Sequence, residues 1–162
     1  MSDSIKNALK MMPYGFYAIT TNDGDEVNAM VANWVTQSSF SPRQLTLAIQ
    51  HYCYSYGLMH KGRVFAVNIF HQDNFEAMRP FTKARSKSPD KMETATFTPA
   101  PETGCPVLEG AAAFIECKIV AILDTGGDHH LIVGEVINAG VNQELEASEA
   151  LTLPHIGWSY AG

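Results

Sequence analysis

The chain has 162 residues with a net charge of −6 at pH 7, and 46% of its residues are hydrophobic. A chain of this length can bury roughly 70% of the surface that it exposes when unfolded, and its hydrophobic content excludes a disordered segment. We therefore expect a single globular domain over residues 1–162. The acidic balance and the scattered Lys and Arg residues argue against a nucleic-acid partner.

Residues 1–10 are polar, and no stretch of the chain reaches the roughly 18 apolar residues that a membrane-spanning helix requires. The sequence thus predicts no membrane association and a cytoplasmic location. Three cysteines, Cys53, Cys105 and Cys117, form an odd set with no CxxC spacing. They are expected to be reduced thiols, and no metal site is predicted.

A short helix is expected to begin at an N-cap, Ser4, and to end before Pro13. Its apolar residues fall at helical spacing, which predicts an amphipathic lid over another part of the molecule. Strand patterns follow over residues 15–21 and 26–35, on either side of a turn at residues 22–25. This arrangement is typical of a β-hairpin.

Further strands are indicated by apolar alternation and by Val, Ile and Phe enrichment over residues 44–50, 63–70, 111–123 and 131–138. The expected helices, 55–60 and 73–78, are too short to connect parallel strands, and no GxGxxG follows a strand. The pattern therefore favours a mainly β fold of about six strands, a barrel or sandwich, over a parallel Rossmann sheet.

A polar stretch over residues 81–106 is too long for a plain connection in a compact domain, and we expect it to lie over a site or a partner subunit. Lys83, Arg85 and Lys87 in this stretch could meet one small anion or could belong to a solvated loop.

Three other segments could carry chemistry. Residues 32–42 place amide and hydroxyl donors beside apolar residues, which suits a flat heteroaromatic ligand, although a strand end leading into a Ser-Pro turn gives the same pattern. Residues 50–55 lead into a helix at Ser55, where free N–H groups could bind a phosphate. Ser55 could equally be a plain N-cap.

The third segment, residues 126–136, is a tight turn that delivers His129 and His130 onto a buried strand. Adjacent residues of a strand point to opposite faces, so one of the two at most should face a site, and a shared metal ion is not expected. No GxSxG or similar motif indicates a hydrolase.

Four stretches in order resemble the flavin reductase-like, FMN-binding split-barrel family. They are NAMVANWVTQSSFSP (28–42), GRVFAVNIF (62–70), GDHHLIVGEV (127–136) and GWSY (157–160). The resemblance implies a split β-barrel of antiparallel, Greek-key-like topology with a few short helices. It also implies an FMN cofactor and a homodimer with the flavin near the interface.

The resemblance also assigns residues. Those that would line the isoalloxazine ring are Asn33, Trp34, Val35 and Thr36. Those near the ribityl phosphate would be Ser38 and Ser39, and the phosphate itself would be held by Tyr54 and Ser55. Lys83 or Arg85 would substitute for the basic residue that many relatives carry beside the serine, and Trp34 stands where relatives usually have a small residue.

By the same resemblance His129 would lie close to the flavin and the nicotinamide, as the catalytic residue, while His130 receives no role. The implied activity is that of an NAD(P)H:flavin reductase, which passes electrons from NAD(P)H through flavin to free flavin or to a redox partner protein. Two alternatives remain: an FMN electron carrier that a redox protein reduces, and a cofactor-free binding barrel.

Overall fold

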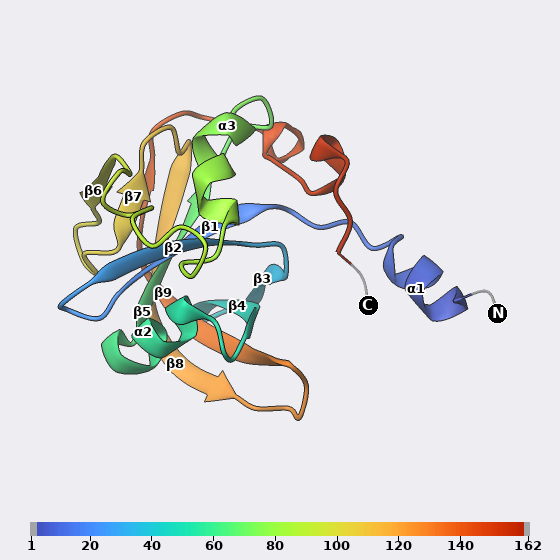
Figure 1. The fold of residues 1–162 in the computed structure, drawn as a ribbon, viewed down its shortest axis with the longest axis horizontal. Helices are drawn as coiled ribbons and strands as arrows, with labels where there is room; N and C mark the ends of the chain where they lie inside the picture. The colour runs from blue at the N-terminus through green and yellow to red at the C-terminus, as the bar shows by residue number, and fades with distance from the viewer. Residues whose placement is uncertain (1–2, 161–162) are drawn as a thin grey trace.

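The computed structural model describes residues 3–160, so residues 1–2 and 161–162 of the predicted domain lie outside the described part. Strands are the main secondary structure of the fold (Figure 1). They are β1 (Tyr17–Asn22), β2 (Val27–Ala32), β3 (Val35–Phe40), β4 (Arg43–Gln50), β5 (Val64–Ile69), β6 (Phe97–Pro99), β7 (Pro106–Leu108), β8 (Ala113–Leu123) and β9 (His129–Val141). The helices are α1 (Ser4–Leu9), α2 (Tyr54–Gly62) and α3 (Phe75–Met78), with 3-10 turns η1 (Arg79–Thr82), η2 (Ala147–Glu149) and η3 (Pro154–Ile156).

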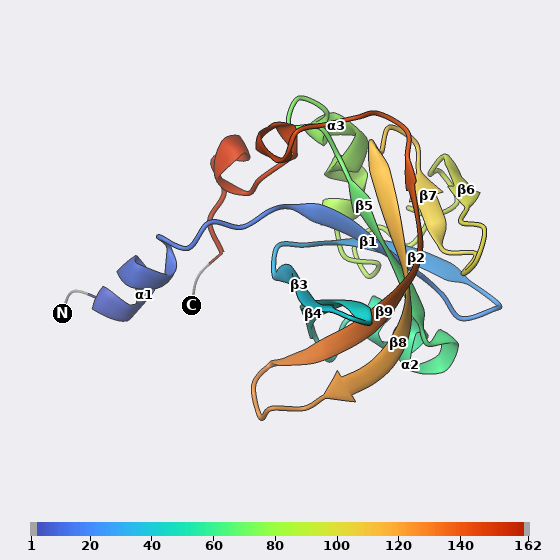
Figure 2. The same ribbon diagram turned by 180° about the vertical axis from the view of Figure 1, so that it is seen from behind.

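One antiparallel sheet of seven strands has the order β2-β1-β5-β8-β9-β4-β3, and β6 pairs with β7 separately. The two outermost strands, β2 and β3, follow each other directly in the chain, joined by Asn33 and Trp34. A link of two residues can join opposite edges only if the sheet curls strongly, and Figure 2 shows this curl. Because β2 and β3 do not pair within the described residues, the barrel stays split. The predicted antiparallel, mainly β fold is confirmed, since every strand pair of residues 3–160 is antiparallel.

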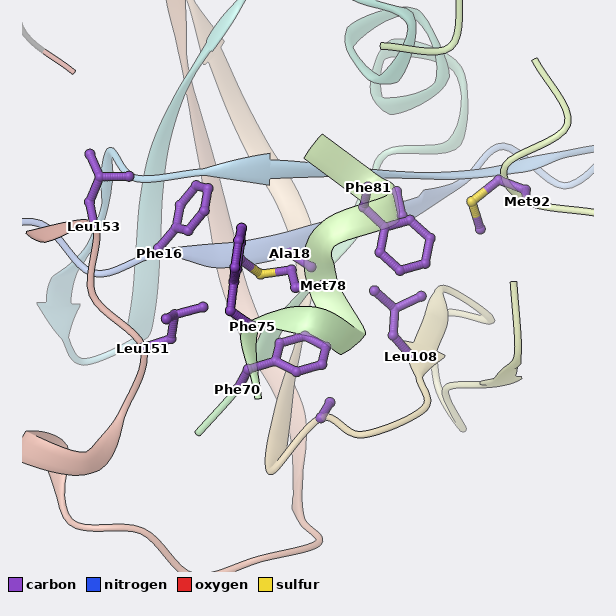
Figure 3. Close-up of a cluster of buried hydrophobic side chains, with 12 residues drawn as sticks. Phe16, Ala18, Phe70, Phe75, Met78, Phe81, Met92, Leu108, Leu151 and Leu153 are labelled. Atoms are coloured by element: carbon purple, nitrogen blue, oxygen red, sulfur yellow. The ribbon is translucent and has the colours of Figure 1, made fainter. Parts of the chain in front are cut away.

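Successive residues of β1 enter two different cores, as the pleat of a strand requires. Ile19 packs inside the curled sheet with Leu47, Phe65 and Ile132, whereas Ala18 faces the opposite side. Figure 3 shows this second core, in which α3 and η1 cover the outer face of the sheet. Its aromatic members are Phe16, Phe70, Phe75 and Phe81.

The hairpin predicted around residues 22–25 forms, and β1 pairs with β2 in register from Tyr17–Ala32 to Asn22–Val27. The single strand predicted over residues 26–35 is wrong, because the chain leaves one edge of the sheet at Ala32 and enters the other edge at Val35. Residues 35–40, whose polarity also fits a turn, form the edge strand β3. An edge strand tolerates polar residues because much of it faces solvent.

The N-terminal helix differs from the sequence prediction in two ways. Its N-cap is Asp3, whose side chain accepts a hydrogen bond from the Lys6 amide at 2.9 Å, and not Ser4. Helix α1 also stands away from the sheet (Figures 1 and 2), and within the described chain none of its residues is buried. Ile5 is 76% exposed, so α1 is not a lid over its own barrel.

The long stretch 81–106 is held in place by two buried polar side chains of the sheet. Asn68 donates to the Pro106 carbonyl and accepts from the Leu108 amide. Glu116 accepts hydrogen bonds from the Thr103 amide and hydroxyl, both at 2.7 Å, and from Asn138 at 2.6 Å. Buried polar groups with satisfied hydrogen bonds fix one conformation, so the stretch is an ordered part of the fold. No helix among the described residues is long and apolar enough to cross a membrane.

Candidate flavin site

Two adjoining cavities lie beside the link that joins β2 to β3. The larger has a volume of about 670 Å³ and the smaller about 340 Å³. They adjoin, since five residues line both, namely Met30, Val31, Gln50, Cys53 and Thr82. An elongated ligand could therefore reach from one cavity into the other.

A chain of hydrogen bonds forms one wall of the larger cavity. Arg85 donates from Nη1 to Asn28 Oδ1 at 3.1 Å, and Asn28 donates from Nδ2 to Ser55 Oγ at 2.9 Å. Asn28 and Ser55 are only 2% and 1% exposed. Since the Ser55 oxygen accepts from Asn28, its hydroxyl proton is left to donate to a ligand.

Ser55 lies in the first turn of α2, where backbone N–H groups lack intrahelical partners. The N-cap of this helix is Cys53, which makes no side-chain capping hydrogen bond. Ser55 is therefore not the N-cap, and the reading of it as a plain cap is wrong. The Tyr56 N–H donates to the Cys53 carbonyl at 3.2 Å, whereas no side chain caps the earlier N–H groups of the turn, which leaves them available to an anion.

The larger cavity also has a buried cation. Lys91 is 4% exposed, and its ammonium group donates to the Lys83 carbonyl at 2.9 Å. Burial, together with the positive charge of Arg85, lowers the pKa of Lys91 to about 8. Within residues 3–160 no carboxylate forms a salt bridge with Lys91. This end of the site therefore has an excess of positive charge.

The smaller cavity is aromatic. The Trp34 ring lies edge-on to His129, with centroids 4.8 Å apart, and to Tyr160 at 5.0 Å. Trp158 and Phe16 line the same cavity. His129 Nδ1 lies 2.7 Å from Asp128 Oδ1, and this hydrogen bond holds the pKa of Asp128 below its usual range. Such a lining suits flat aromatic rings.

One polar atom of the smaller cavity has no partner. Asn33 Nδ2 is buried, and no hydrogen-bond acceptor reaches it among the described residues. An unsatisfied buried donor costs about 1–3 kcal/mol. An acceptor on a ligand, such as a ring carbonyl, would relieve that cost.

The structure brings together six of the residues assigned from the sequence. Asn33, Trp34 and His129 line the smaller cavity. Tyr54, Ser55 and Lys83 line the larger one, although the Lys83 side chain is exposed. The other four line neither cavity in the described structure and lie on the edge strand β3: Val35, Thr36, Ser38 and Ser39.

Sequence reasoning missed two residues of the larger cavity, Asn28 and Lys91. Asn28 had a signal, since it is the only polar residue of the otherwise apolar strand β2. Lys91 had none, because its burial depends on how the long stretch 81–106 folds. His130 points away from the smaller cavity and meets the Tyr56 hydroxyl at 2.7 Å. Within the described residues no group of three His, Cys, Asp or Glu could hold a metal ion.

The family of the chain follows from a comparison with known proteins. Residues 9–157 match the sequence profile of the flavin reductase like domain. The chain belongs to this family. It is 35% identical over 152 residues to putative diflavin flavoprotein A 3 from Nostoc sp., covering 93% of this chain and 25% of the relative. This flavin reductase-like chain thus spans about a quarter of the length of the curated relatives it matches.

Solved structures of the family share the architecture. The NADH:FAD oxidoreductase SgcE6 of Streptomyces globisporus, in complex with NAD and FAD fragments, has a TM-score of 0.72 and 30% identity, covering 80% of this chain and 76% of that one. The flavin reductase HpaC complexed with NADP+ has a TM-score of 0.75 and 26% identity, with 90% of each chain covered.

Proposed function

We propose that this flavin reductase-like chain binds FMN across the two cavities and uses it to oxidise NAD(P)H. The observation that carries the proposal is that a positively charged cavity directly adjoins an aromatic one. FMN has the same division, with a phosphate at one end and a flat ring system at the other. A ligand without a phosphate would leave Lys91 and Arg85 facing an empty charged pocket.

The polar groups of the site fit FMN in number and kind. At the larger cavity the Ser55 hydroxyl, the first-turn N–H groups of α2, Lys91 and Arg85 are all donors, as a phosphate requires. At the smaller cavity the Asn33 amide would donate to a ring carbonyl. The exposed Lys83 would add charge at the mouth. We propose FMN rather than FAD as the cofactor, with its single phosphate bound by this donor set.

Bound flavin would supply the chemistry of hydride acceptance from a nicotinamide and onward electron transfer. The protein's share is to orient the two rings and exclude water. Trp34 and Tyr160 close one side of the smaller cavity, and His129, fixed by Asp128, presents its free Nε2 atom. The NAD fragments in SgcE6 and NADP+ in HpaC support a pyridine nucleotide as the electron donor.

The electron acceptor is proposed to be free flavin or a redox partner protein. The similarity to diflavin flavoproteins, of which this chain spans about a quarter, supports a partner that carries a second flavin. The same similarity supports a second candidate function, that of an FMN electron carrier that another protein reduces.

We also propose that the chain is one domain, works in the cytoplasm and forms a homodimer. Burial raises the pKa of the Cys105 and Cys117 thiols to about 12, which disfavours the reactive thiolate and fits the free thiols expected of a cytoplasmic protein. Support for the dimer comes from α1, where Ile5 and Leu9 are exposed and contact no core of the described chain.

Purification and stopped-flow reduction test the function. We expect a yellow protein, or one that quenches added FMN fluorescence, whose flavin NADH or NADPH bleaches without oxygen. A colourless protein that does not quench FMN overturns the flavin proposal. Flavin that binds but is reduced by neither nucleotide favours the electron carrier. Light scattering at micromolar concentration tests the dimer, and a monomer would contradict it.

A further inference from the structure

Lys91 is the most unusual charged residue of the molecule. An ammonium group has three donors, and in residues 3–160 only one of them has a partner, the Lys83 carbonyl at 2.9 Å. The side chain is buried and lines the larger cavity. A buried charge without a counter-ion is costly, so proteins seldom keep one unless a ligand supplies the missing charge.

The groups that surround Lys91 do not supply that charge. Arg85, from the same long stretch, is a second cation, and its one acidic neighbour in the described chain, Glu26, lies 3.9 Å from Nη2. The Cys53 thiol faces Lys91 from the start of α2, and burial raises the pKa of that thiol above its usual value. Tyr54 stacks under the Arg85 guanidinium, with 4.8 Å between the guanidinium carbon and the ring centroid. Of the charged residues that line the cavity, Lys91, Arg85 and the exposed Lys83 are all cations.

We propose that Lys91 selects a phosphate monoester dianion and takes up a proton as that dianion binds. The inference rests on the proposed function, because the monoester is the phosphate of FMN. It adds a residue that determines which flavins bind, and a coupling between flavin affinity and pH. Riboflavin has no phosphate, and each phosphate of FAD has a single negative charge.

The direction of the pH effect follows from the two states of Lys91. In the ligand-free protein burial and Arg85 hold its pKa at about 8. A dianion in contact with the amine restores the pKa toward its usual range near 10.4. At a pH between these two pKa values, Lys91 takes up a proton when FMN binds. The affinity for FMN therefore falls by up to about tenfold per pH unit above pH 8. The FMN phosphate, whose second pKa is near 6, stays a dianion throughout.

Calorimetric titration with FMN, FAD and riboflavin tests this at pH 7, 8 and 9, in two buffers of different ionisation enthalpy. We expect uptake of about half a proton per FMN at pH 8 and none with riboflavin. In Lys91→Met the preference for FMN over riboflavin should fall at least about tenfold, and proton uptake should vanish. Lys91→Arg should bind FMN without the pH dependence, because a guanidinium stays charged. Lys118→Met, at an exposed lysine of β8 outside both cavities, is the matched control.

The outcomes separate this inference from the proposed function. If FMN binds and is reduced, but Lys91→Met keeps the wild-type selectivity and pH profile, Lys91 has no such role while the proposed function stands. If FMN and riboflavin bind equally well to the wild type, the selectivity claim is wrong. If no flavin binds, both proposals are overturned together. Circular dichroism of each variant shows whether it has folded.

Discussion

His129 and Asp128 share a hydrogen bond of 2.7 Å between Nδ1 and Oδ1 at the start of β9. Asp128 is exposed, whereas the His129 side chain is 15% exposed and lines the smaller cavity. The bond engages the ring nitrogen Nδ1, while Nε2 has no hydrogen-bond partner among residues 3–160. An imidazole held in this way can contact a second substrate without contributing to the phosphate end of the site.

His129→Ala should slow flavin reduction by NADH or NADPH by at least about tenfold, the loss of about 1.4 kcal/mol of transition-state stabilisation, while FMN stays bound. An interaction made mainly with the second substrate does not hold the cofactor. Stopped-flow absorbance under anaerobic conditions measures the rate, and fluorescence quenching measures FMN affinity. His155→Ala, outside both cavities, is the control. Reduction at the wild-type rate with both nucleotides would leave His129 a structural role.

Ser55→Ala should weaken FMN binding by about 1 kcal/mol, because its hydroxyl is one donor among several to the phosphate. The Asn28 amide then loses its acceptor, so some stability should be lost as well. Riboflavin binding separates the two effects, since only the direct contact depends on the phosphate. An equal loss of affinity for both flavins would indicate that Ser55 acts by positioning Asn28.

The chain has two tryptophans, and both line the smaller cavity. Flavin in that cavity should therefore quench most of the intrinsic tryptophan fluorescence. Trp34→Phe should remove a large part of the starting emission and leave the flavin-dependent quenching of Trp158 intact. FMN that binds, as its own absorbance reports, without quenching either tryptophan would place the ring outside this cavity.

How far the sequence predicts this fold depends on how local each signal is. Strand β4 was predictable because Leu45, Leu47 and Ile49 alternate with less buried residues, and one buried face imposes that period. In β8 the register shifts between Glu116 and Cys117, so both residues are buried and the alternation breaks. A bulge of this kind depends on the partner strand, so no local sequence pattern predicts it.

The residues of the site also differ in whether a local sequence pattern predicts them. Ser55 and His129 lie at chain reversals that the sequence marks with turn and helix signals. The local sequence does not distinguish Lys91 from a solvated lysine, because it is buried only by the packing of the long stretch 81–106. The length of that stretch predicts that it covers a site, but its anchoring to Asn68 and Glu116 is a tertiary property.

Glu116→Gln tests that anchoring. Burial opposes ionisation of Glu116, but hydrogen bonds from Asn138, Thr103 and the Glu102 amide outweigh it and hold its pKa below the usual range. Stability from this carboxylate is therefore fully present above the unfolded pKa, near 4.3, and is lost as the pH falls through the folded value. We expect the variant to lose about 2 kcal/mol at pH 7 in urea denaturation, and the difference to shrink at pH 3.5. Glu93→Gln, an exposed control, should change neither value. A constant difference at both pH values would contradict the linkage.

Asn33→Ala should affect stability and binding in opposite directions. Removal of the unpaired Nδ2 donor relieves a buried, unsatisfied group, so the ligand-free protein should unfold at an equal or higher urea concentration. The same change removes the donor proposed for a ring carbonyl, so FMN and riboflavin should both bind about tenfold more weakly, from the loss of one well-placed hydrogen bond. Asn7→Ala, on the exposed helix α1, controls for the substitution itself. If flavin affinity is unchanged and the ligand-free protein loses stability, Asn33 is a structural residue, and the ring must bind elsewhere along the two cavities.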